Sequence, residues 1–193
     1  MRKNASRADN QQERLEKIPS STAWYFTGFA DGEGSFNVSL IPRKDYRFGW
    51  KIYLTFNVAQ RDQSVLLLMK EYFGAGRLEL RKDGVWNYSV NDFYSLNEII
   101  IPFFEMYPFL SISKQKNFSI FKQIVEIMEK DGHFNQEGLE KIILLREKLN
   151  EGKGRKRKYS IIDYQKSRES SETNTSDIVF RGDEDRVRSH GRP

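Results

Sequence analysis

The sequence contains no cysteine and only two histidines, His133 and His190, among its 193 residues. The absence of cysteine excludes disulfides, thiolate metal sites and cysteine nucleophiles, and it is typical of an intracellular protein. Two histidines are too few for a histidine-rich zinc site, and they give no support to a histidine-centred triad. The composition therefore argues against thiol, zinc and Ser-His-Asp chemistry.

Long apolar runs are also missing, and none reaches the length of a membrane span. The first 17 residues are too polar for a signal peptide. We therefore expect no membrane partner and an intracellular location, either a bacterial cytoplasm or an organelle. The formal net charge of +5 mildly favours a polyanionic partner.

Composition divides the chain into a polar N-terminal tail (residues 1–19), an ordered domain (20–152) and a C-terminal tail (153–193). A chain of this length can bury a sizeable core in one domain. The C-terminal tail begins with "KGRKRK" at 153–158, which either holds phosphates or is a solvated linker. Its later part is rich in Ser, Glu, Arg and Gly, so we expect much of residues 166–193 to be disordered.

The ordered domain alternates between helical and strand patterns. Residues 22–31 follow capping Ser and Thr residues and predict a helix, whereas residues 35–41 and 50–60 alternate with period two and predict a hairpin. A second hairpin at 76–90 turns at Asp83-Gly84. Further helices are expected at 62–74, 92–101, 114–130 and 136–149. This order predicts an α+β fold: an αββαββα core whose antiparallel sheet of two hairpins carries helices on one face.

The two faces of the predicted sheet differ in chemistry. The apolar positions, expected in the core, include Phe36, Val38, Leu40, Ile52, Leu54, Phe56, Leu78, Leu80, Tyr88 and Val90. The opposite face carries few acids and many residues that hydrogen-bond bases and phosphates. An ordinary solvated face is the alternative, but the composition favours nucleic-acid binding. The polar positions are Ser35, Asn37, Ser39, Arg43, Lys51, Tyr53, Thr55, Asn57, Arg77, Glu79, Arg81, Asn87 and Ser89.

Two carboxylates stand at the expected end of the first helix, in "FTGFADGEGSF" at 26–36. Gly32 and Gly34 are expected to stop the helix and turn the chain. A helix C-terminus carries partial negative charge, so Asp31 and Glu33 are electrostatically disfavoured there. They are either solvated acids in a turn or ligands of a hard divalent cation that reverses the local electrostatics.

The same stretch, as "FTGFADGEG", resembles the signature helix of the LAGLIDADG homing endonucleases, and a strand beginning Ser-Phe follows it as in that family. "FNVAQRD" at 56–62 resembles the end of the family's second strand. "YPFLSISKQKNFSIFKQIVEIM" at 107–128 and "HFNQEGLEKIILLREKLNEG" at 133–152 resemble its C-terminal helices. The resemblance covers residues 23–152 in the expected order, which makes it far more specific than the signature alone. It implies that the polar sheet face is a DNA-binding saddle.

The signature occurs once, and single-signature members of the family work as homodimers whose signature helices pack side by side. The resemblance therefore implies a homodimer with Phe26, Gly28 and Phe29 at its interface. Close approach of a second helix would account for Gly28, because glycine inside a helix costs about 1 kcal/mol relative to alanine. A dimer with one two-fold axis implies a long, roughly palindromic double-stranded DNA target.

The resemblance also implies the catalytic residues. The last acid of the family's signature binds metal and corresponds to Glu33, and the carbonyl of Gly32 is implied as a second ligand of Mg²⁺ or Mn²⁺. The family's pocket lysine corresponds to Lys114, and its pocket glutamine to Gln60. Alternative catalytic residues are Asp31, Lys116 and Arg61.

These assignments imply a site-specific, metal-dependent endonuclease that cuts both DNA strands. Water activated by the metal would attack each scissile phosphate, and Lys114 would help to stabilise the charge that develops. Two alternatives share the fold: a maturase that binds its own intron RNA, and a DNA-binding protein without cleavage activity. The acid at Glu33 argues mildly against a maturase alone, since RNA binding does not need it.

Overall fold

The computed structural model describes residues 14–152 and 157–166. Helix α2 (Ser20–Glu33) leads into strands β1 (Gly34–Pro42) and β2 (Trp50–Gln60), followed by α3 (Ser64–Phe73) and strands β3 (Arg77–Leu80) and β4 (Trp86–Val90). The remaining elements are helical: α4 (Phe93–Ser95), η1 (Leu96–Ile100), α5 (Ile101–Met106), α6 (Ile112–Glu129), η2 (Gly132–Phe134), α7 (Gln136–Lys148) and η3 (Leu149–Gly152). The predicted α+β order is confirmed.

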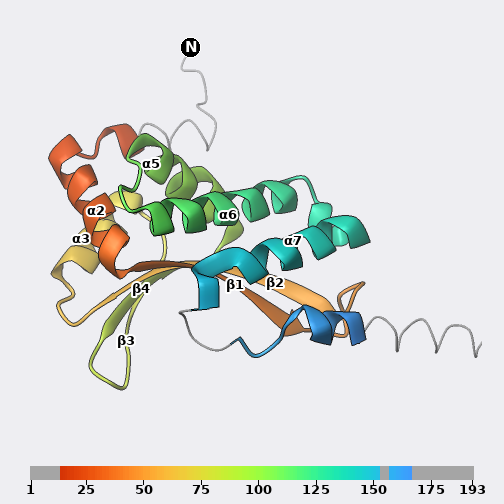
Figure 1. The fold of residues 1–193 in the computed structure, drawn as a ribbon. Helices are drawn as coiled ribbons and strands as arrows, with labels where there is room; N and C mark the ends of the chain where they lie inside the picture. The colour runs from red at the N-terminus through yellow and green to blue at the C-terminus, as the bar shows by residue number, and fades with distance from the viewer. Residues whose placement is uncertain (1–13, 153–156, 167–193) are drawn as a thin grey trace, which may run out of the picture.

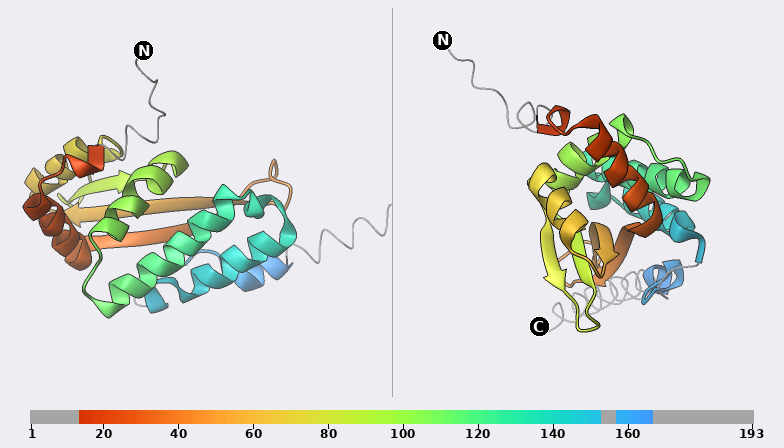
Figure 2. Two further views of the ribbon diagram at one scale, coloured as in Figure 1. Left: turned by 90° about the horizontal axis from the view of Figure 1, so that it is seen from above. Right: turned by 90° about the vertical axis from the view of Figure 1, so that its left-hand side faces the viewer.

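The four strands form one antiparallel sheet in the order β1-β2-β4-β3. Helices α5, α6 and α7 lie over one face of the sheet, and the β3–β4 hairpin projects from it away from these helices (Figure 1). The view from above shows α6 and α7 running along β1 and β2, with α2 at the opposite end from the β1–β2 turn (Figure 2). One face of the sheet is therefore covered and the other is left open.

The strand alternation sorts residues as the sequence predicts. Phe36, Val38, Ile52, Leu54 and Phe56 are all buried beneath the helices. Phe36 has the most aromatic neighbours of the group, among them Phe56 and Phe121 at ring-centroid distances of 5.2 and 5.1 Å. This aromatic cluster fixes the register of the sheet, because a slip of one residue would turn every apolar side chain to the open face.

Leu80 contradicts the predicted core. Its side chain is 57% exposed, whereas Tyr88 and Val90 of the same hairpin are fully buried. Leu80 ends β3, the edge strand of the hairpin that projects beyond the helices, so no second layer covers it. Alternation identifies the face on which a side chain lies but not whether that face is covered at that point.

Helix boundaries also differ from the prediction in two places. Gly32 does not stop the first helix, which continues through Glu33. The segment expected at 92–101 is helical from Phe93 to Met106, with a π turn at η1. Pro102 follows that turn and has no amide to donate, so the wider turn accommodates it.

Both ends of the described chain pack on the domain beyond its predicted limits. Leu15 and Ile18 are buried. At the other end, Tyr159 packs edge-on against Trp50 with ring centroids 5.2 Å apart. The guanidinium of Arg157 donates to the carbonyls of Arg146, Glu147 and Leu149 at the end of α7, at 2.6 to 3.2 Å. Arg157 therefore caps a helix, and it also pairs with the Glu147 carboxylate at 2.9 Å. Residues 153–156 of the basic segment lie outside the described residues.

Candidate active site

The candidate site begins where α2 meets β1 without an intervening loop. Glu33 is the last residue of the helix and Gly34 the first of the strand. The Gly34 amide donates to the Ala30 carbonyl, and a Cβ at Gly34 would lie 2.5 Å from that oxygen. Only glycine therefore fits this junction, which delivers the Glu33 side chain directly to the edge of the open sheet face.

Asp31 holds the end of α2 to the start of α6. Its carboxylate accepts hydrogen bonds from the Ser111 hydroxyl and from the Ser111 amide, the latter at 3.0 Å. Ser111 is the N-cap of α6, so this carboxylate lies at the positive end of that helix and is stabilised there. Because both carboxylate oxygens are engaged within the protomer, the geometry favours Glu33 over Asp31 as a metal ligand.

Glu33 itself is exposed. Gly32 lies in the last turn of α2, where helix carbonyls lack intrahelical partners. A carboxylate and a backbone carbonyl are the hard oxygen donors that Mg²⁺ and Mn²⁺ accept, so these residues fit such an ion. Within the described residues there is no group of three or more His, Cys, Asp and Glu side chains that could hold a metal ion.

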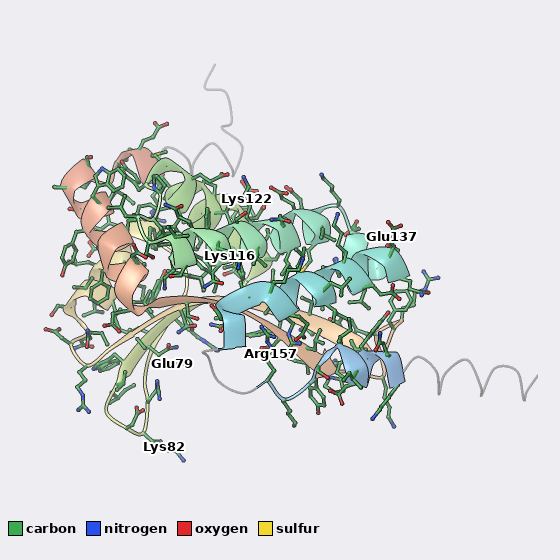
Figure 3. The ribbon with its side chains drawn as sticks, viewed as in Figure 1. Glu79, Lys82, Lys116, Lys122, Glu137 and Arg157 are labelled. Atoms are coloured by element: carbon green, nitrogen blue, oxygen red, sulfur yellow. The ribbon has the colours of Figure 1, made fainter. Side chains whose placement is uncertain are left out.

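Lys114 lies against the same junction. Its Nζ donates to the Gly34 carbonyl from the first turns of α6. Burial lowers the pKa of Lys114, and the charges of Asp31 and Glu33 partly oppose that shift. Lys116, labelled in Figure 3, is exposed two residues further along α6 and so lies on a different side of that helix. The geometry therefore favours Lys114 as the pocket lysine.

Gln60 ends β2 at the same end of the sheet. Val58 pairs with Gly34 in the β1–β2 register, so Gln60 lies two residues beyond that pair, at the level of the α2 C-terminus. Its Oε1 accepts from the Arg61 amide at 2.8 Å, and the Arg61 side chain is exposed. Glu33, Lys114 and Gln60 thus come from three separate elements to one end of the sheet.

The open face carries a chain of amide side chains across three strands. Asn37 donates to Asn57 at 2.7 Å, and Asn57 donates to Asn87 at 3.3 Å. Ser35 accepts from Asn37 at 3.2 Å. These bonds couple the orientations of the amides, so the face presents an ordered set of donors and acceptors.

Each predicted arginine of this face has an acidic partner two residues on. Arg43 pairs with Asp45 at 2.7 Å, and Arg81 pairs with Asp83 at 2.6 Å. Arg77 pairs with Glu79 at 3.3 Å. All six side chains are about half exposed or more, so water screens each pair and the arginine could exchange its carboxylate for a phosphate. The acids Asp45 and Asp83 lie in the turns after β1 and β3 and were not among the predicted site residues.

The remaining predicted residues of the open face also lie on it. Tyr53 accepts a hydrogen bond from Asn91, a residue that sequence reasoning missed because it follows the last strand. Ser89 differs from the other residues of this face because its side chain is buried. Ser39 is exposed, and the half-buried residues are Lys51, Tyr53 and Thr55.

The predicted dimer interface needs one correction. Phe26 is fully buried and packs against Tyr72 and Phe73 inside the protomer, so no partner can contact it. Gly28 is exposed, and a Cβ there would meet nothing within 4 Å. Phe29 is partly buried and stacks on Tyr25, which is 55% exposed. The exposed side of α2 therefore combines aromatic rings with Gly28 and Gly32.

A second exposed apolar group lies beside α2. Leu110 and Ile112 are 82% and 83% exposed in the segment that leads into α6. This segment runs along α2, because Thr27 donates to the Tyr107 carbonyl and Ser111 donates to Asp31. Leu110 and Ile112 are therefore exposed apolar side chains in a segment that packs beside α2. Among the described residues, no helix has the length and hydropathy to cross a membrane.

Sequence comparison relates the chain to endonucleases. A family model described as LAGLIDADG endonuclease matches residues 26–125. The chain is 37% identical over 148 residues to probable intron-encoded endonuclease 2 of Neurospora crassa, a match that covers 70% of this chain and 32% of that relative. The chain thus spans about a third of this curated relative's length.

Solved structures also resemble most of the chain. The archaeal intron-encoded homing endonuclease I-Vdi141I complexed with DNA is similar with a TM-score of 0.71 and 27% identity, over 76% of this chain and 94% of that one. I-SmaMI bound to an uncleaved DNA target in the presence of calcium ions has a TM-score of 0.64 and 32% identity, over 68% of this chain and 46% of that one.

Proposed function

The chain belongs to the LAGLIDADG endonuclease family, and we propose that it is a site-specific homing endonuclease that hydrolyses both strands of DNA with bound Mg²⁺ or Mn²⁺. The observation that carries this proposal is the convergence of Glu33, Lys114 and Gln60 at one end of an open, polar sheet face. The match to 94% of I-Vdi141I, a structure determined with DNA, supports it. An organelle or a bacterial cytoplasm remains the proposed location.

The protomer contributes charge and position to hydrolysis. Glu33 and the Gly32 carbonyl would hold the divalent ion, which when bound activates water and stabilises the leaving oxygen. The ammonium of Lys114 lies beside this point and stabilises the negative charge that develops on the phosphate. Gln60 orients the attacking water through its amide. The water oxygen bonds to phosphorus as one P–O bond of the backbone breaks, and its protons pass to solvent and the leaving oxygen.

We also propose a homodimer formed through α2. Two observations support it: a Cβ at Gly28 would meet nothing within 4 Å in the protomer, and Leu110 and Ile112 are exposed in the segment that packs beside α2. Glycines four apart, Gly28 and Gly32, let two helix backbones approach closely. Packing two α2 C-termini together would bring one Glu33 from each protomer to the middle of the DNA.

DNA recognition falls to the open sheet face. We expect Arg77→Ala and Arg81→Ala to relax preference for one base pair in each half-site, symmetrically, because a bidentate arginine–guanine contact contributes about 1–3 kcal/mol of discrimination. A binding-site selection on each variant measures this. If both variants keep the wild-type preference at every position, these arginines contact phosphates at most.

Phe56→Ala is the control for this test. Phe56 is fully buried on the covered side of the same sheet. Its truncation should lower the free energy of unfolding by about 2–5 kcal/mol and leave base preference unchanged in the folded fraction. The contrast separates recognition on the open face from packing on the covered face.

The proposed function is tested by DNA cleavage. The intron-free junction of the gene that carries this reading frame, cloned in a plasmid, should be linearised by the protein with Mg²⁺ and remain intact in EDTA. Specific binding without cleavage in Mg²⁺ would instead identify a cleavage-inactive DNA-binding protein. Binding to intron RNA with no affinity for the DNA junction would identify a maturase.

A further inference from the structure

Strand β2 has an open edge over half of its length. It pairs with β1 from Trp50 to Val58, but β4 pairs with it only from Phe56 to Gln60. On the side away from β1, residues 51–55 therefore have no strand partner among the described residues. Unpaired amides and carbonyls in an extended strand are a template for a further strand.

A pocket of about 590 Å³ lies along this open edge. Residues 51–54 line it, together with Phe93 beyond β4, Met128 in the last turn of α6 and Phe134 in η2. Phe134 is 54% exposed, and Phe93 is 37% exposed. Strand edge and apolar pocket together form a site for an extended chain with apolar side chains, since the backbone would pair with the edge and alternate side chains would enter the pocket.

Basic residues flank the pocket. Lys51 and Arg47 both line it. Asp45 lines the pocket too, but its carboxylate is held by Arg43 in a bidentate pair. The site therefore suits an apolar strand with acidic residues close by.

We propose that this site is occupied by the C-terminal part of the same chain, residues 177–185, "DIVFRGDED". Ile178, Val179 and Phe180 are the one run of three large apolar residues in 167–193, and all three favour extended strands. In an extended strand Ile178 and Phe180 share one face and Val179 takes the other. The acids at 183–185 follow directly and complement Arg47 and Lys51.

The position of the chain end supports an intrachain occupant. Tyr159 already packs on Trp50, the residue just before the open edge. Residues 157–166, drawn in blue, lie at the end of the molecule where the β1–β2 turn and the α6–α7 turn are also found (Figures 1 and 2). Residues 167–177 can extend about 35 Å at roughly 3.3 Å per residue, which is ample to bring Ile178 to the edge.

Disulfide trapping tests the proposal, because the wild-type chain has no cysteine and gives no background. Phe93→Cys in the full chain is combined with a single cysteine at 178, 179 or 180 and oxidised. Cysteines at 178 or 180 should crosslink within one chain at least tenfold faster than a cysteine at 179, because alternate strand positions face the pocket. Leu144→Cys, on the exposed surface of α7, is the control and should show no such alternation.

Three outcomes would overturn the proposal. Equal rates at 178, 179 and 180 would indicate a loosely tethered tail, and no crosslink above the Leu144→Cys background would mean that the tail does not reach the site. Crosslinks found only between two chains would assign the edge to a second copy. These results do not depend on cleavage activity, so they stand apart from the proposed nuclease function.

Hydrogen exchange provides a second readout without cysteines. Amides of residues 51–54 that face the open edge should exchange slowly in the full chain if a strand covers them. The backbone amides of successive residues in a strand point to opposite edges. One of the two amides at 179 and 180 would therefore bond to β2, and either Val179→Pro or Phe180→Pro would remove it. That variant should speed exchange at the edge at least tenfold. Unchanged exchange in both variants would contradict strand addition.

Discussion

Glu33→Gln is expected to reduce DNA cleavage by at least a hundredfold while DNA binding persists. The substitution keeps the size of the side chain and removes the negative charge that would hold a divalent cation. The Glu33 side chain is exposed at the end of α2, so its loss of charge should leave protomer stability unchanged. Single-turnover cleavage in Mg²⁺, compared with binding to the same DNA in EDTA, measures the two effects separately.

Glu137→Gln is the matched control for Glu33→Gln. Glu137 is an exposed glutamate in the first turn of α7, far from the α2 C-terminus (Figure 3). The same chemical change there should leave cleavage within twofold of wild type. If Glu33→Gln also cuts at nearly the wild-type rate, Glu33 does not bind the metal.

Gly28→Leu is expected to abolish the dimer and, with it, double-strand cleavage, without unfolding the protomer. Within the protomer a Cβ at this position meets nothing within 4 Å, and replacing a helical glycine by leucine stabilises a helix by up to about 1 kcal/mol. Between two packed helices the same side chain would hold the backbones apart. Light scattering measures the loss of the dimer, and thermal unfolding measures whether the protomer keeps or gains stability.

Gln123→Leu provides the comparison for Gly28→Leu, since Gln123 is exposed on α6 and gains the same side chain. It should retain the dimer mass and the cleavage rate. A Gly28→Leu protein that stays a soluble dimer of unchanged mass would place the interface away from α2. Loss of thermal stability in Gly28→Leu would show instead that the glycine serves the protomer.

The strands and their covered face were predictable from the sequence because period-two alternation depends only on local backbone geometry. Phe36, Ile52 and Phe56 follow that rule and are buried. Leu80 obeys the same alternation and is exposed, because the end of its hairpin extends beyond the helices. Whether a strand face is covered depends on elements distant in sequence.

The candidate site likewise depends partly on local sequence and partly on contacts between elements that are distant in sequence. Family resemblance identified Glu33 as the expected metal ligand, but the two acids of the motif could be separated only by contacts across the fold. Asp31 bonds Ser111, eighty residues away, whereas Glu33 stays exposed at the sheet edge. The choice of Lys114 over Lys116 likewise rests on the contact with the Gly34 carbonyl, because the linear spacing allowed both.

By itself, the sequence determined the order of helices and strands, the polar and apolar faces of the sheet and the position of the signature acids, since each depends on local periodicity or on a short motif. Tertiary structure alone decided that Phe26 belongs to the core, that Gly28 lies open and that Arg157 caps α7. Those outcomes depend on which surfaces other elements cover. Coverage is a property of long-range packing, and neighbouring residues in the chain do not encode it locally.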